Sequence, residues 1–298
     1  MRRPFLILPA LLLMSATAMA TSSHHHGNRT ISFADFDNAA TDCSALRAQF
    51  DGDRVPVVTE NVPIGNVRSL RIRSDQNGGI RVIGSRTGSY AVTACKAAAL
   101  TSDVSQVRVS ITGNEVSATG PDSDNWVVYF IVQTPRGATL DLSSGNGPIG
   151  VYEFDGTLTA RAQNGPLGIK SSSGTIDAST VNGPISIDGG SGIVKLTATN
   201  GPLAVRLDGS AWLGSLDAST QNGPVSLRLP RAFRSGVVLE SLGHGPVSCH
   251  AEGCASVERL RQTGDFDDDR PRRIDLGSGT ASVHLSTVNG PISVRDND

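Results

Sequence analysis

The sequence contains few charged and few aromatic residues, and after its first 20 residues it has no long apolar run. Charged residues make up 18% and aromatic residues 4% of the 298 residues, whereas about 25% of residues in soluble domains are charged. This composition disfavours a helix-rich architecture with many ion pairs. The formal net charge is −2. Because nucleic-acid-binding domains are usually basic, we expect no nucleic acid among the partners.

The sequence also lacks the short motifs of common active sites. It contains no H-E-x-x-H, no G-x-S-x-G, no Walker loop and no C-x-x-C, which are signatures of metal-dependent, nucleophilic, phosphate-binding and redox chemistry. We therefore expect no catalytic residues, no cofactor and no metal. The alternative is a carbohydrate-active parallel β-helix enzyme, a polysaccharide lyase or glycoside hydrolase, in which carboxylates, Lys and Arg would gather outside the coil.

The N-terminal apolar run has the parts of a secretory signal. Arg2 and Arg3 precede an apolar stretch at 5–14, and Ala18-Met19-Ala20 supplies a small-residue cleavage site. The stretch is shorter than the roughly 20 residues that span a bilayer. We predict residues 1–20 to be a removed signal peptide. The mature chain is then expected in the periplasm, outside the cell or on its surface, without a transmembrane anchor.

The four cysteines are an even number in a chain predicted to reach an oxidising compartment, where disulfides are the default. Three pairings are possible, and short separation favours Cys43 with Cys95 and Cys249 with Cys254. A zinc site is disfavoured because the C-x-x-C spacing is missing.

An Asn-Gly-Pro tripeptide recurs through the second half of the chain. The first four copies are 18 residues apart and the fifth follows after 22. A degenerate copy, His244-Gly245-Pro246, comes 22 residues later, and the last copy lies a further 45 residues on, which predicts that one intervening rung has lost its motif. The complete copies begin at Asn146, Asn164, Asn182, Asn200, Asn222 and Asn289.

Each repeat predicts two short strands. The third and fifth residues after each Asn are apolar, as in Leu167 and Ile169, and small or apolar residues alternate before it, as in Leu158, Ala160 and Ala162. Residues two apart on a strand share a face. These two sets therefore predict a narrow core.

Asn-Gly between alternating strands also suggests a β-hairpin, but the following Pro has no N–H to close a two-residue turn. In the corner of a solenoid, Asn can stack on Asn, Gly can bend the chain and Pro can open the next strand. A calcium-binding β-roll is disfavoured because the turns contain too few carboxylates. We predict an all-β, parallel β-solenoid, β-helix-like, with rungs of 18 to 22 residues.

The domain organisation follows from this repeat. We predict a flexible or irregular lead at 21–60, a strand-rich N-terminal part of the solenoid at 61–140, and regular repeats at 141–298. A bulge or corner is expected near Glu240, which would otherwise point inward.

The signal, the strand-rich segment with Asn77-Gly78-Gly79 and the stacked Asn-Gly-Pro units together resemble a bacterial family of extracytoplasmic β-strand-repeat proteins. The family is a domain of unknown function often labelled "putative adhesin". The resemblance covers about residues 60–298 and implies an extracytoplasmic solenoid with no known substrate. The chain departs from it in the longer units after Asn200 and in an acidic loop near Asp267.

One outward column of the predicted solenoid is net basic. Its candidate binding residues are Lys170, Arg206, Arg228 and His250, and beside them runs a column of small residues that leaves the face flat. A row at rung spacing could follow the carboxylates or phosphates of an extended anionic glycan or another envelope component. The alternative is ordinary edge charge, in which Asp188 neutralises Lys170 and Arg206.

Three other charged groups have simpler interpretations. The column of Thr159, Asp177, Lys195 and Asp217 suggests a solvated ladder of ion pairs. The acidic loop resembles the start of a calcium site but lacks the required Gly and Glu. The segment His24-His25-His26 could bind a metal as a tail or be inert.

Overall fold

The computed structural model describes residues 31–33, 41–85, 88–123, 125–243, 245–254 and 272–297. The predicted signal peptide, the His24-His25-His26 segment, His244 and the acidic loop lie outside them. The regular secondary structure of the described chain is almost all β-strand, and most strand pairs are parallel, as expected. Its helical segments are η1 (Cys43–Ala45), α1 (Thr101–Val104) and η2 (Glu252–Cys254). No helix in the described segments is both long enough and apolar enough to cross a membrane.

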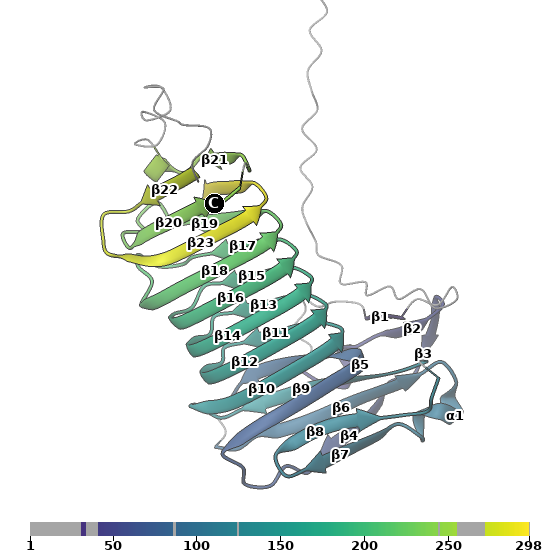
Figure 1. The fold of residues 1–298 in the computed structure, drawn as a ribbon. Coiled ribbons are helices and arrows are strands. Elements are labelled where there is room, and N and C mark those ends of the chain that lie inside the picture. The colour runs from purple at the N-terminus through teal and green to yellow at the C-terminus, as the bar shows by residue number, and fades with distance from the viewer. Residues whose placement is uncertain are drawn as a thin grey trace, which may run out of the picture.

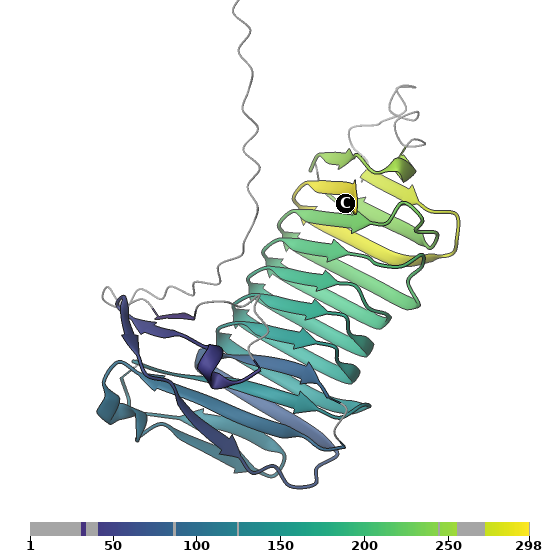
Figure 2. The ribbon, with the colours of Figure 1, turned by 180° about the vertical axis from the view of Figure 1, so that it is seen from behind.

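Two facing sheets form the main body, which is a stack of layers (Figures 1 and 2). Each layer contributes one long strand to the first sheet and one short strand to the second. The long-strand sheet contains β10 (Ala138–Asn146), β12 (Asp155–Asn164), β14 (Ser173–Asn182), β16 (Gly192–Asn200) and β18 (Gly214–Asn222). The short-strand sheet contains β11 (Ile149–Tyr152), β13 (Leu167–Lys170), β15 (Ile185–Asp188), β17 (Leu203–Arg206) and β19 (Val225–Leu229).

Neighbouring layers pair in parallel and in register with the sequence repeat. Leu158 lies beside Ile176 in the long-strand sheet, and Ile169 lies beside Ile187 in the short-strand sheet. β5 (Ser69–Gly84) passes through both sheets, pairing with β10 and with β11. Because every strand alternates its side chains, the apolar sets face each other across the two sheets, and Leu158, Ile169 and their equivalents are buried.

The Asn-Gly-Pro segments lie where the long strands end and the short strands begin. From Asn164 onward, the side-chain Nδ2 of each corner Asn donates to the Oδ1 of the Asn in the preceding layer. The distance is 2.9 Å for Asn164 to Asn146 and 2.8 Å for Asn182 to Asn164. A Cβ on Gly165 would overlap the carbonyl oxygen of Gly147, and the same holds at the other corners. Glycine is required here because the layers approach closely, not because the backbone is left-handed.

The last layers do not stack in sequence order, which corrects the prediction. β23 (Ala281–Asn289) lies between β18 and β20 (Gly236–Ser241), and β24 (Ile292–Asp296) lies between β19 and β21 (Val247–Cys249). No degenerate rung therefore separates the last Asn-Gly-Pro from the fifth. The physical reason is the corner: Asn289 Nδ2 donates to Asn222 Oδ1 at 2.8 Å, and its glycine neighbour packs on the corner glycine of that layer.

The expected irregularity near Glu240 lies slightly earlier, between Gly236 and Val237. The shift leaves Glu240 only partly buried. Its carboxylate binds Arg273 at 3.0 Å and faces His284 Nε2 at 3.2 Å.

Antiparallel strand pairs lie at both ends of the stack. At the C-terminal end, β22 (Arg272–Leu276) pairs with the edge of β20. At the other end, β9 (Trp126–Thr134), β6 (Ala91–Ala98) and β4 (Val58–Val62) extend the short-strand sheet, while β8 (Glu115–Thr119) and β7 (Arg108–Thr112) extend the long-strand sheet. Atypical layers at the ends of the stack are common in repeat proteins.

Residues of the predicted irregular lead form part of this N-terminal end. β1 (Ile31–Phe33), β2 (Ala48–Phe50) and β3 (Asp53–Val55) make a small antiparallel sheet, and Phe50 packs against the outer side of β6 and β9. The Cys43–Cys95 disulfide ties η1 to β6, and Cys249–Cys254 ties η2 to β21. Both pairings agree with the prediction.

Candidate functional site

The outward face of the short-strand sheet carries two parallel columns of side chains. One, the small-residue column, is flat because its members are glycine, alanine and serine. In stacking order it consists of Gly150, Gly168, Ser186, Ala204, Ser226, Ser293 and Ser248. The second column consists of Tyr152, Lys170, Asp188, Arg206, Arg228 and Arg295, followed by His250 in the last layer.

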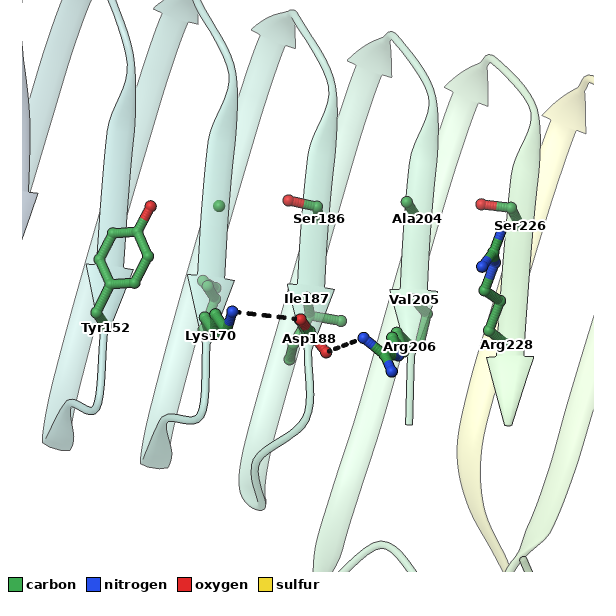
Figure 3. A pocket seen from close by; sticks show the side chains of 12 residues that line it. Tyr152, Lys170, Ser186, Ile187, Asp188, Ala204, Val205, Arg206, Ser226 and Arg228 are labelled. Carbon is green, nitrogen blue, oxygen red and sulfur yellow. Dashed lines mark ion pairs between the residues drawn. The ribbon is translucent and has the colours of Figure 1, made fainter. Parts of the chain in front are cut away.

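A groove of about 370 Å³ lies between these columns. It extends from Tyr152 at one end to Arg228 at the other, and the small-residue column supplies its floor (Figure 3). Three of the four predicted binding residues, Lys170, Arg206 and Arg228, line it. His250 does not, because the interposed layer places Arg295 between Arg228 and His250.

In the first half of the charged column, Asp188 lies between two cations. Its carboxylate lies 3.9 Å from Lys170 Nζ and 3.8 Å from Arg206 Nη1. All three side chains are substantially exposed, so these contacts are weak. This half of the row fits the alternative of edge charge partly neutralised by Asp188.

The second half of the row is different. Arg228 and Arg295 are exposed and lie side by side in adjacent layers, and neither forms an ion pair with any residue in the described ranges. Layers are about 4.8 Å apart in a hydrogen-bonded sheet. Arg228 and Arg295 thus add two adjacent positive charges to this column, followed by His250 in the last layer.

Sequence reasoning placed Tyr152 in the outward column but missed Arg81, which packs on it at the other end of the groove. Arg81 of β5 is aligned with Gly150, at the head of the small-residue column, and is only 1% exposed. Its guanidinium carbon lies 4.3 Å from the ring centroid of Tyr152. Burial raises the pKa of the neighbouring Tyr129, although the positive charge of Arg81 opposes this. The Asn77-Gly78-Gly79 segment indicated that β5 follows the repeat, but no sequence pattern indicated that Arg81 is buried.

The outward column of the long-strand sheet does not form the suggested ladder. No ion pair joins Asp177, Lys195 and Asp217 to one another, as far as the structure describes the chain. An ion pair occurs instead near one end of the sheet, where Arg71 binds Asp141 at 3.0 Å, and near the other end His284 Nδ1 lies 3.8 Å from Asp217. Within the described ranges, no group of three His, Cys, Asp or Glu side chains is placed to hold a metal ion.

Comparisons with known proteins give distant structural likenesses only. No family model and no curated protein matches the chain. It is similar to a putative cell adhesion protein from Clostridium sporogenes, with 9% identity and a TM-score of 0.33 over 81% of this chain and 100% of the other. It is also similar to a putative adhesin from Bacteroides fragilis, with 10% identity and a TM-score of 0.30 over 81% of this chain and 97% of the other. A putative lipid binding protein from Parabacteroides distasonis has 8% identity and a TM-score of 0.21, again over 81% of this chain and 97% of the other.

The names of the first two agree with the family that the sequence resembles. At these TM-scores the function of the chain has to be inferred from its own residues.

Proposed function

We propose that this protein is an exported, non-enzymatic β-solenoid of the cell envelope, adhesin-like, that binds an extended anionic polymer along the groove of its short-strand sheet. The solenoid interpretation, with Asn-Gly-Pro corners, is supported by the parallel register between layers and by the chain of Asn–Asn hydrogen bonds. Export is supported by the two disulfides, which are typical of oxidising compartments.

The observation that carries the proposal is the row of Lys170, Arg206, Arg228 and Arg295 beside a flat floor. The hydrogen-bonded strands set the spacing of these residues, because each residue comes from a strand and not from a flexible loop. An extended ligand would therefore contact a straight row of cations. Guanidinium groups bind carboxylates and phosphates through two parallel hydrogen bonds. Arg228 and Arg295 form no ion pair with the residues that the structure describes, so they offer this fork without first breaking such a pair.

A carbohydrate-active enzyme is the second candidate. Glycosidases generally place two carboxylates across the bond that they cleave, whereas Asp188 is the one carboxylate among the residues that line this groove. The carboxylate of Asp188 is instead shared between Lys170 and Arg206, at 3.9 and 3.8 Å. These features favour binding over catalysis.

The test is a charge reversal with a matched control. Arg206→Glu combined with Arg228→Glu should weaken binding of a soluble polyanion at least about tenfold at low salt, because two charge-assisted contacts become repulsive. Arg161→Glu combined with Lys195→Glu changes the net charge equally on the outward face of the other sheet, where both residues are exposed, and should have little effect.

Binding would be measured by calorimetry over a salt series with polygalacturonate and with inorganic polyphosphate. The difference between the two double variants should shrink as salt screens exposed charges. Equal losses in both double variants would show that only net charge matters. If the wild-type protein binds neither polymer, the proposed function is wrong.

A further inference from the structure

At the Tyr152 end of the groove, a buried arginine packs against an aromatic ring. Binding of anions by the cationic row does not require this contact. Arg81 extends outward from β5 and is buried, although it faces the same side as the small-residue column. In the next layer the aligned position is Gly150, which has no side chain to occupy the space there. The guanidinium group of Arg81 lies against the ring of Tyr152, 4.3 Å from its centroid.

The two partners of this contact differ in their access to the groove. Tyr152 is partly exposed and lines the groove, whereas Arg81 is buried and does not. The ring therefore separates the guanidinium from the groove, with one face on Arg81 and the other accessible. In Figure 3 the ring is seen nearly broadside, and its hydroxyl reaches the level of the small-residue column.

This contact holds the flat ring of Tyr152 in a fixed orientation against the guanidinium group of Arg81. The contact with Arg81 restrains the ring, so little rotamer freedom remains to be lost when a ligand binds. Lys170 is the next residue along the same column and is exposed. Its backbone is one layer spacing of about 4.8 Å from that of Tyr152. Its ammonium lies toward Asp188, at 3.9 Å, in an exposed and weak contact, so the flexible side chain can turn to a ligand that covers the ring.

We infer that Tyr152 is a stacking subsite for a sugar ring, and that the polymer bound by the groove is an acidic polysaccharide. A pyranose ring presents C–H groups on its faces, which pack on an aromatic face, and hydroxyl or carboxylate groups on its rim. With the ring of a uronic acid on Tyr152, its carboxylate could reach Lys170. A polyphosphate has no apolar face, so Tyr152 would add nothing to its binding.

This inference rests on the proposed function, but it predicts a different pattern of losses. Tyr152→Leu keeps an apolar group over Arg81 and removes the flat ring. It should weaken polygalacturonate binding about threefold to tenfold, as expected for the loss of an aromatic contact. It should leave polyphosphate binding unchanged. Tyr152→Phe keeps the ring and should bind polygalacturonate nearly as well as the wild type.

Arg206→Glu combined with Arg228→Glu should weaken both polymers, and this separates the two proposals. If that double variant loses binding while Tyr152→Leu binds polygalacturonate like the wild type, the stacking inference is overturned and the cationic groove stands. Equal losses of both polymers in Tyr152→Leu also overturn it. If neither polymer binds the wild-type protein, both proposals fall. Thermal unfolding of each variant verifies that the fold is retained.

Discussion

Replacing Asn182 by alanine tests whether the corner asparagines hold the layers together. Asn182 Nδ2 donates to Asn164 Oδ1 at 2.8 Å, and its Oδ1 accepts from Asn200 Nδ2 at 3.0 Å. Both bonds are lost in Asn182→Ala. Asn182 is exposed, so water can reach the groups left behind and no desolvation penalty is added. At a net value of about 0.5 to 1 kcal/mol per bond, the loss should be about 1 to 2 kcal/mol.

Asn289 is the matched comparison because it stands at the end of the ladder. It donates to Asn222 at 2.8 Å, and in the neighbouring layer on its other side the chain has no asparagine at the corner. Asn289→Ala should therefore cost about half as much as Asn182→Ala, or about 0.5 to 1 kcal/mol. Gln221→Ala, an exposed change beside the ladder, should cost less than either.

Asn182→Asp sharpens the test. The carboxylate can still accept from Asn200, but it has no N–H for Asn164 and places one oxygen against another. This variant should be less stable than Asn182→Ala at pH 7, and the difference should diminish as the carboxyl group is protonated at low pH. Urea midpoints at constant slope measure all four variants. Equal midpoints for the Asn182 and Asn289 alanine variants would refute the ladder.

Three further predictions concern the corner glycines, the disulfides and the signal peptide. Gly201→Ala should cost about 2 to 3 kcal/mol in urea unfolding, since its Cβ would overlap a backbone carbonyl, whereas Gly65→Ala has open space and should be neutral. Removing the Cys43–Cys95 disulfide, with a sequence separation of 52, should cost about 4 kcal/mol, against about 2 kcal/mol for Cys249–Cys254, with a separation of 5; equal costs would contradict the loop-length argument. Secretion should yield a chain starting at Thr21, and intact mass showing a retained leader would contradict the predicted cleavage site.

Local patterns predicted the strands well because each layer repeats one simple constraint. Alternation of side chains assigned Leu167 and Ile169 to the core, and both are buried. The missing N–H of proline correctly excluded a hairpin, because the strands that flank each Asn-Gly-Pro pair with neighbouring layers in parallel. These inferences needed only interactions between residues close in sequence or one repeat apart.

The order of the last layers depends on contacts that the sequence pattern does not encode. A repeat predicts which segments can form layers but not their sequence of stacking, because any Asn-Gly-Pro corner fits on any other. Asn222 gains a hydrogen-bonding partner when Asn289 follows it. The burial of Arg81 was missed for a similar reason: alternation marks it as outward, while its cover comes from Tyr129 of β9 and Tyr152 of β11.

The interposed layer also couples ligand binding to the stability of the C-terminal end. It places Arg295 beside Arg228 in adjacent layers, and both residues are exposed. Two like charges at the layer spacing of about 4.8 Å would repel by about 1 kcal/mol even in water. No carboxylate in the described ranges offsets this repulsion through an ion pair with either residue. A bound polyanion would remove the repulsion and bind only the folded protein, so it should raise the thermal midpoint of the wild type.

Arg295→Gln removes the repulsion without a ligand. This variant should be slightly more stable than the wild type in low salt, and polygalacturonate should raise its midpoint less. If Arg295→Gln is destabilised at low salt, the two guanidinium groups do not repel as the geometry predicts, and the coupling is wrong.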